Sequence, residues 1–273
     1  MKTIVSPKSR ILAGLALATL LIEATNVSAQ SVGGGAASLD YLYITPKNET
    51  DCVVICNPWL ISVTTMTSDG TCLKSDSASG TDPSYEVAVK TFFGSHGSFV
   101  NAEDRHDPYG EADSTSNGFE PGVYNVMGSS TANLSNTFIV HGGEGTVCVN
   151  FETDISLQAI ALSAGTGYTA GGSGYFRMFL DDQQLFQRCF SINAADGSFD
   201  FVDDLPTLCR TIQLEYGQQY ALSIEMGASS YATGDGSEPP PFEEPVPEAS
   251  TMLAAAFGFG AIGAQRLWKR ARA

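Results

Sequence analysis

Thr146-Val147-Cys148-Val149-Asn150-Phe151 is the stretch that decides the fold class of this chain. The two valines and the phenylalanine occupy alternate positions, and the threonine, cysteine and asparagine lie between them. Successive side chains of a β-strand point to opposite faces, so this alternation predicts a strand with one buried face.

Similar alternation or β-branched runs recur on both sides of this stretch. We expect strands over residues 38–44, 59–65, 85–93, 137–140, 155–164, 175–180, 184–192, 199–201, 209–216 and 219–226. Turns are expected at Gly142-Gly143, Thr153-Asp154 and Asp181-Asp182, and Gly217-Gln218 predicts a hairpin between the last two strands. Residues 30–37, 67–85, 94–136 and 165–174 are rich in glycine or small polar residues and are predicted to be flexible or loop segments.

The first expected strand, 38–44, has its own pattern of two faces. A strict period of two places Leu39, Tyr41 and Tyr43 on one face. The same period places Asp40, Leu42 and Ile44 on the other face.

The spacing of these segments predicts an all-β protein. Strands recur every 8 to 20 residues, and almost no run has a helical period. We therefore predict an antiparallel β-sandwich of jelly-roll or immunoglobulin-like type over residues 30–226. Residues 227–247 are acidic and rich in proline, which is typical of an extended stalk.

The N-terminus has the three parts of a secretory signal peptide. Lys2, Lys8 and Arg10 form a basic segment, and an apolar segment follows over 11–22. Val27-Ser28-Ala29 has small residues at the positions that signal peptidase requires. We therefore expect residues 1–29 to be removed by cleavage between Ala29 and Gln30.

The C-terminus combines a short motif, an apolar helix and a basic cluster. Val246-Pro247-Glu248-Ala249-Ser250-Thr251 precedes a stretch without charges that runs to Gln265. We predict a short transmembrane helix over 249–267, near the lower limit of length for crossing a bilayer. A basic cluster that stays on the cytoplasmic side follows, and it consists of Arg266, Lys269, Arg270 and Arg272.

Residues 246–273 resemble the PEP-CTERM sorting signal of Gram-negative envelope proteins. Pro247-Glu248 matches the family's Pro-Glu, and Ser250-Thr251 matches the small hydroxyl residues after it, whereas Ala249 replaces the usual second proline. The resemblance implies recognition by an exosortase, a membrane-embedded protease or transpeptidase, and cleavage near Pro247-Glu248. It also implies an inner-membrane precursor, a mature protein at the cell surface or outside the cell, and an association with exopolysaccharide.

The charge of the exported part limits the classes of partner that it can bind. Residues 30–248 contain 7 basic and 29 acidic residues, which gives a net charge of −22. Such a body does not attract nucleic acid or anionic lipid, and its charge suits either solubility outside the cell or the binding of divalent cations.

Six cysteines fall in the exported part, and an even number in an oxidising compartment predicts disulfides. They are Cys52, Cys56, Cys72, Cys148, Cys189 and Cys209. Three lie in each half of the chain, so either one bridge joins the halves or two thiols remain free. Cys189–Cys209 is the most plausible local pair, and the Cys52-x3-Cys56 spacing is not that of a zinc or redox motif.

Residues 101–113 form the densest polar cluster, and two interpretations of it remain open. Carboxylate oxygens suit Ca²⁺, for which the candidate ligands are Glu103, Asp104, Asp107, Glu111 and Asp113. The spacing of a calcium loop is absent, so a solvated surface loop without a cofactor is the other interpretation. His96, His106 and His141 have no spacing typical of a zinc site.

Aromatic residues provide the remaining clue to function. Aromatic side chains exposed together on one face of a sheet can stack on sugars, but aromatic residues in strands are more often buried. The candidates are Tyr41, Tyr43, Trp59, Tyr109, Tyr168 and Tyr175. We interpret the protein as a non-enzymatic cell-surface or matrix component associated with exopolysaccharide. The alternatives are a secreted carbohydrate-active hydrolase and a calcium-dependent carbohydrate-binding module.

Overall fold

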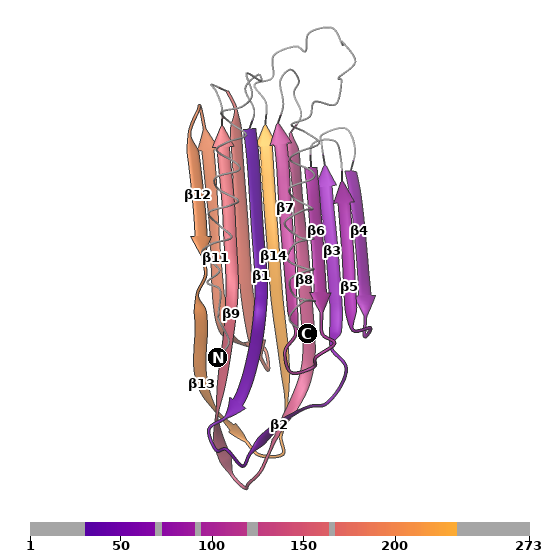
Figure 1. Ribbon diagram of the computed structural model, residues 1–273, viewed down its shortest axis with the longest axis vertical. Coiled ribbons are helices and arrows are strands. Elements are labelled where there is room, and N and C mark those ends of the chain that lie inside the picture. Colours follow the sequence, from indigo (N-terminus) through magenta and orange to yellow (C-terminus); the bar gives the residue numbers. More distant parts are fainter. Residues whose placement is uncertain (1–30, 69–72, 91–93, 119–124, 164–166, 234–273) are drawn as a thin grey trace, which may run out of the picture. The chain divides into compact units, whose positions relative to one another are not determined.

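Two antiparallel sheets packed face to face form the fold (Figure 1). The computed structural model describes residues 31–68, 73–90, 94–118, 125–163 and 167–233, and it shows strands, turns and bends there but no helix. The described strands belong to one compact unit bounded by Ala29 and Glu238. The antiparallel β-sandwich expected from the sequence is therefore confirmed at the level of two packed sheets.

The described residues form seven strands in each sheet. The order in sheet A is β12 (Phe199–Asp204), β9 (Thr146–Ser163), β1 (Ser31–Pro46), β7 (Tyr109–Gly118), β6 (Gly94–Asn101) and β5 (Ser84–Lys90), and β13 (Thr207–Glu215) also pairs with β9. The order in sheet B is β11 (Gln183–Ala195), β10 (Thr169–Leu180), β14 (Gln219–Thr233), β8 (Val126–His141), β3 (Leu60–Ser68) and β4 (Leu73–Gly80), and β2 (Cys52–Ile55) also pairs with β8.

Both ends of the chain lie outside the described residues. This applies to the expected signal peptide 1–29, to the sorting signal 246–273 with its helix 249–267, and to the stalk from residue 234 onward. Within the described ranges, no helix is long and apolar enough to cross a membrane.

Two turns expected from the sequence are wrong. β9 runs without interruption through Thr153, which is buried and donates a hydrogen bond from Oγ1 to the backbone oxygen of Tyr41 over 2.6 Å. The turn at Gly217, where φ is 74°, does not close a hairpin, because β13 pairs with β9 in sheet A while β14 pairs with β8 and β10 in sheet B. Alternation locates a strand, but it does not say which strand lies beside it.

The segments predicted to be loops are largely strands. β1 begins at Ser31, β4 lies within 67–85, β6, β7 and most of β8 lie within 94–136, and β10 begins at Thr169. β14 continues to Thr233, so the domain boundary expected at residue 226 is also wrong. These strands are rich in small residues because the two sheets approach each other closely along them.

Glycines set this close approach between the sheets. A Cβ atom on Gly172 of β10 would lie 1.8 Å from the backbone oxygen of Gly34 in β1. A Cβ atom on Gly35 of β1 would lie 2.1 Å from the backbone oxygen of Ser173. Backbone therefore packs against backbone, which leaves no room for any side chain at these positions.

We expect Gly172→Ala to lower the free energy of unfolding by about 3 kcal/mol, because a methyl group there forces the sheets apart. The melting temperature should fall by roughly 10 °C. Gly97→Ala is the control, since its Cβ would meet only the Asp113 carboxylate, at 2.8 Å, and that side chain can move. Equal melting temperatures for the two variants would contradict the backbone contact.

The first and last described residues of the sandwich are joined. Ser31 Oγ donates a hydrogen bond to the backbone oxygen of Thr233 over 2.8 Å. β1 therefore begins, and β14 ends, at the same end of the sandwich (Figure 1).

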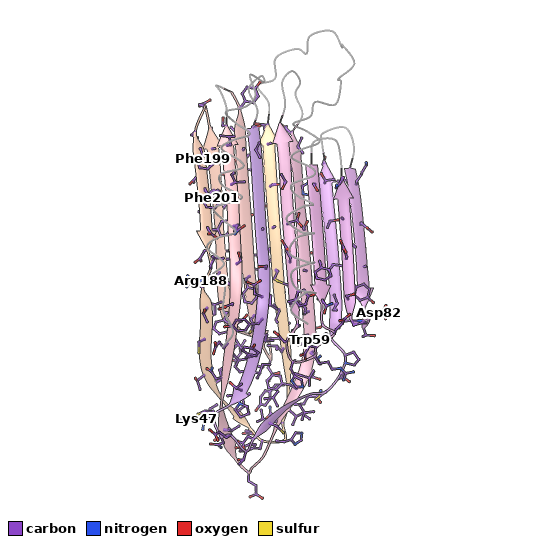
Figure 2. The ribbon with its side chains drawn as sticks, viewed as in Figure 1. Lys47, Trp59, Asp82, Arg188, Phe199 and Phe201 are labelled. Carbon is purple, nitrogen blue, oxygen red and sulfur yellow. The ribbon has the colours of Figure 1, made fainter. Side chains whose placement is uncertain are left out.

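The opposite end of the sandwich holds the large apolar side chains. Phe138 and Phe151 are fully buried, and their ring centroids lie 6.0 Å apart in an edge-on arrangement. Tyr220 packs beside Phe138 with ring centroids 5.7 Å apart. Figure 2 shows large side chains gathered at this end, where Lys47 and Trp59 are labelled. The sandwich is thus packed by aromatic and aliphatic groups at one end and by small residues at the other.

A layer of buried polar side chains lies among the small residues. Ser114 Oγ contacts His96 Nδ1 at 2.8 Å, Ser230 Oγ at 2.7 Å and the backbone oxygen of Gly128 at 3.0 Å. Burial lowers the pKa of His96 to about 4, so the ring is neutral at pH 7. Among the described residues, the buried side-chain atoms Thr65 Oγ1, Thr67 Oγ1, Ser130 Oγ and His96 Nε2 have no hydrogen-bond partner.

Thr67→Val should leave the free energy of unfolding unchanged or raise it, because valine keeps the shape and removes an unpaired buried hydroxyl. Thr153→Val should lower it by about 1–2 kcal/mol, because that hydroxyl donates a hydrogen bond that valine cannot replace. Chemical denaturation of both variants measures the difference. A loss at Thr67 as large as the loss at Thr153 would show that a water molecule holds the Thr67 hydroxyl.

Candidate functional site

The outer face of sheet A carries aromatic and acidic side chains on neighbouring strands. In the register of β1 and β9, Tyr41 lies opposite Asp154 and Tyr43 lies opposite Glu152. We call these four residues the tyrosine patch. The strand pairing joins residues more than a hundred positions apart in the sequence, so the sequence alone did not indicate that these two carboxylates belong with the tyrosines.

A β-bulge at Asp40 turns the two tyrosines outward. The register between β1 and β9 shifts between Leu39 and Tyr41, and this leaves Asp40 as an extra, exposed residue. Leu39 and Leu42 are consequently both buried, while Tyr43 is 49% exposed. The strict period of two, which placed Leu39 on one face with both tyrosines, is therefore wrong, because one inserted residue exchanges the faces of the strand that follows.

The tyrosine patch has defined geometry. The rings of Tyr41 and Tyr43 are stacked, with centroids 4.7 Å apart and planes 29° apart. The Tyr41 hydroxyl donates a hydrogen bond to Glu152 Oε1 over 3.2 Å, and the Thr207 hydroxyl of β13 donates to Asp154 Oδ1. Burial and the nearby Asp154 and Glu152 carboxylates raise the pKa of Tyr41, so the phenol stays protonated. Tyr41 is thereby held in place, whereas Tyr43 is accessible to solvent.

A shallow hollow of about 310 Å³ continues the same strands beyond the patch. Asn150 is one of its lining residues, and Asn150 Oδ1 accepts hydrogen bonds from Cys209 Sγ at 3.1 Å and from Thr211 Oγ1 at 3.3 Å. The lining residues are Thr45, Pro46, Lys47, Cys148, Asn150 and Thr211. These groups provide neutral hydrogen-bonding atoms and one cation beside the two carboxylates of the patch.

A second hollow, of about 200 Å³, lies against β1 and the 102–108 segment. Trp59 lines it and is almost fully buried, and its Nε1 donates a hydrogen bond to the backbone oxygen of Arg105 over 2.9 Å. Trp59 thus anchors the polar segment to the sandwich. No aspartate or glutamate lines either hollow.

The structure separates the six aromatic candidates. It brings Tyr41 and Tyr43 together, whereas Trp59 and Tyr168 are buried. Tyr109 packs beside Phe99 on β6 and β7. Tyr175 belongs to the outer face of sheet B, where its ring lies over Gly227 and close to Arg177.

The structure does not bring the five candidate calcium ligands together. Glu103 and Asp104 are exposed in the turn after β6, and Asp107 Oδ1 accepts a hydrogen bond from the backbone nitrogen of Leu42 at 3.4 Å. Glu111 and Asp113 lie on β7 instead. Among the described residues, no group of three or more His, Cys, Asp or Glu side chains is arranged to hold a metal ion. Calcium binding stays a prediction that no geometry in the described part supports.

The histidines are likewise distributed over separate elements. His96 is buried between the sheets, His106 is exposed in the turn after β6, and His141 is exposed at the end of β8.

Asp113 has an unusual environment of its own. It lies over Gly97 on the outer face of sheet A, and burial together with the Glu111 carboxylate raises its pKa to about 7. The folded protein holds this proton up to about pH 7, while the unfolded chain releases it near pH 4. The carboxyl group therefore destabilises the fold increasingly as the pH rises from 4 to 7.

Asp113→Asn should remove this dependence. We expect its melting temperature to exceed that of the wild type by several degrees at pH 8 and to match it at pH 4. Glu103→Gln, an exposed change of equal charge, is the control and should follow the wild type at both pH values. A difference for Asp113→Asn that does not depend on pH would show that the carboxyl group does not titrate in this range.

The five cysteines that the structure describes are free thiols, namely Cys52, Cys56, Cys148, Cys189 and Cys209. The expected Cys189–Cys209 bridge is absent. Cys189 lies opposite Tyr175 on the outer face of sheet B and Cys209 lies opposite Glu152 on the outer face of sheet A, so the two exposed thiols point away from each other. Cys72 lies outside the described residues. Disulfide formation after export stays a prediction.

Comparison with known proteins does not assign a family. No protein-family model matches the chain, and no curated protein matches it. A crystal structure of the GH31 alpha-xylosidase from Xanthomonas citri aligns with 78% of this chain and 36% of its own, at 8% sequence identity and a TM-score of 0.14. The chain thus spans about a third of that enzyme, and so low a similarity carries no argument about function.

Proposed function

We propose that this protein is an exported, non-enzymatic component of the cell surface or extracellular matrix that associates with exopolysaccharide. The tyrosine patch is the observation that supports a binding role. An accessible tyrosine, a second tyrosine fixed behind it and two carboxylates lie on a sheet face, where a polymer can lie across them. We propose a jelly-roll or immunoglobulin-like topology for the sandwich as well.

The two ends of the chain support export and sorting. The basic and apolar segments before Ala29 fit a cleaved signal peptide, and residues 246–273 fit an exosortase substrate. Export would deliver the sandwich through the inner membrane, where the 249–267 helix holds the precursor. Cleavage near Pro247-Glu248 would then release the protein or attach it to the cell envelope.

A hydrolase is the less favoured function. Glycosidases place two carboxyl groups on either side of the bond that they cleave. Glu152 and Asp154 instead lie two positions apart on one strand of an outer face, and neither shallow hollow is lined by a carboxylate. A calcium-dependent carbohydrate-binding module is distinguished by the effect of a chelator on glycan binding.

The sorting proposal predicts a defined change in mass. In a host that carries an exosortase, intact-mass analysis should show that residues 1–29 and the residues beyond about 248 are lost. The mature protein should accumulate in the exopolysaccharide fraction. Replacing Pro247 and Glu248 with Ala should trap a precursor in the inner membrane, whereas Pro239→Ala, in the stalk, should be processed normally.

Two results would contradict this function. A full-length C-terminus in the exosortase-bearing host would refute processing. Turnover of any polysaccharide by purified residues 30–248 would show that the protein is an enzyme.

A further inference from the structure

We propose that the tyrosine patch binds a glycan chain that carries free amino groups. This inference rests on the proposed association with exopolysaccharide, and it adds the binding surface and the charge of the sugar.

The charges of this face favour a cationic ligand. Glu152 and Asp154 flank the tyrosines, and Asp40 is exposed at the bulge beside them. The nearby cations are Lys47, which lines the hollow around Asn150, and Arg105, which lines the other hollow together with Tyr43. The three carboxylates therefore outnumber the two cations. The exported part has a net charge of −22, so a polysaccharide rich in uronate, sulfate or phosphate is repelled from the protein and from this face.

The pair of tyrosine rings, like the carboxylates, favours a cationic ligand. A protonated amine over the face of a tyrosine ring is attracted by the electrons of the ring, and a carboxylate beside it adds a charge-assisted hydrogen bond. Tyr43 is 49% exposed, and its neighbour Tyr41 is held by stacking and by the bond to Glu152. An amino sugar thus finds an apolar ring for its C–H face and two acceptors for its ammonium group.

Hydrogen bonds within the protein orient the groups of the patch. Tyr41 uses one oxygen of Glu152, and Thr207 uses one oxygen of Asp154, so both carboxylates are oriented and each has a second oxygen. The hollow around Asn150 follows along the same strands and offers acceptors and donors to sugar hydroxyls. From Tyr41 to Thr45 the face spans roughly 13 Å, which is long enough for more than one sugar unit.

Calorimetry on residues 30–248 tests the proposal, since this fragment contains the whole compact sandwich. The probes are a glucosamine hexasaccharide with free amines, the same chain fully N-acetylated, and a hexasaccharide that contains glucuronate, at a pH at which the amines are protonated. We expect the free-amine chain to bind most tightly and to lose affinity at high salt. Tyr43→Ala should weaken it about five- to tenfold, and Glu152→Gln with Asp154→Asn should do so by a similar factor.

One variant serves as the control in the same experiment. Tyr175→Ala removes a tyrosine from the outer face of sheet B and should leave the affinity unchanged. An unchanged melting temperature for each patch variant shows that a loss of affinity comes from the patch and not from unfolding.

The outcomes separate this inference from the function on which it rests. Equal or tighter binding of the N-acetylated or glucuronate chain, or full affinity in Tyr43→Ala, overturns the inference. If the mature protein still accumulates with exopolysaccharide in that case, the proposed function stands and only the site or the sugar is wrong. If no glycan binds and the protein is absent from the exopolysaccharide fraction, both are wrong.

Discussion

Direct contact between the backbones of the two sheets is the constraint on which the rest of this structure depends. Gly34 and Gly35 of β1 lie against Gly172 and Ser173 of β10, where a Cβ atom on Gly35 or Gly172 would overlap a carbonyl oxygen. Stacked sheets in most sandwiches are about 10 Å apart because side chains interdigitate between them. Here glycine, alanine and serine occupy the interface at one end of the molecule. The hydrophobic core is therefore concentrated at the other end, around Phe138 and Phe151.

The bulge at Asp40 links this packing to the surface. Before the bulge, β1 follows the register that suits the narrow, glycine-packed end. After it, the strand presents Leu42 to the aromatic core and both tyrosines to the outside. Without the extra residue, the face that carries Leu39 would also carry the tyrosines, and two phenols would enter the core while Leu42 faced water. One inserted residue thus satisfies the core and creates the tyrosine patch.

The fold class was predictable from the sequence because alternation is a local property of a strand. Thr146 to Phe151 shows it plainly, and these residues do form part of β9. The strands at the narrow end were not predictable in this way, since Gly33, Gly34 and Gly35 carry no hydrophobic signal and have the composition of a loop. The sequence also did not allow us to predict which strands pair with each other. Glu152 and Asp154 lie beside the tyrosines only because β1 pairs with β9. The turn at Gly217 connects the two sheets, although its sequence is typical of a hairpin.

The hydrogen bond between Ser31 and Thr233 joins the first and last described residues of the sandwich. Ser31 and Thr233 therefore lie at one and the same end of the sandwich. Tyr41 lies ten positions along β1 from Ser31, which places the patch roughly 33 Å from that end at about 3.3 Å per residue. If the protein is attached through residues after Thr233, as the proposed sorting implies, the chain joins the sandwich at the end far from the tyrosine patch. The proposed glycan surface would then lie clear of that junction.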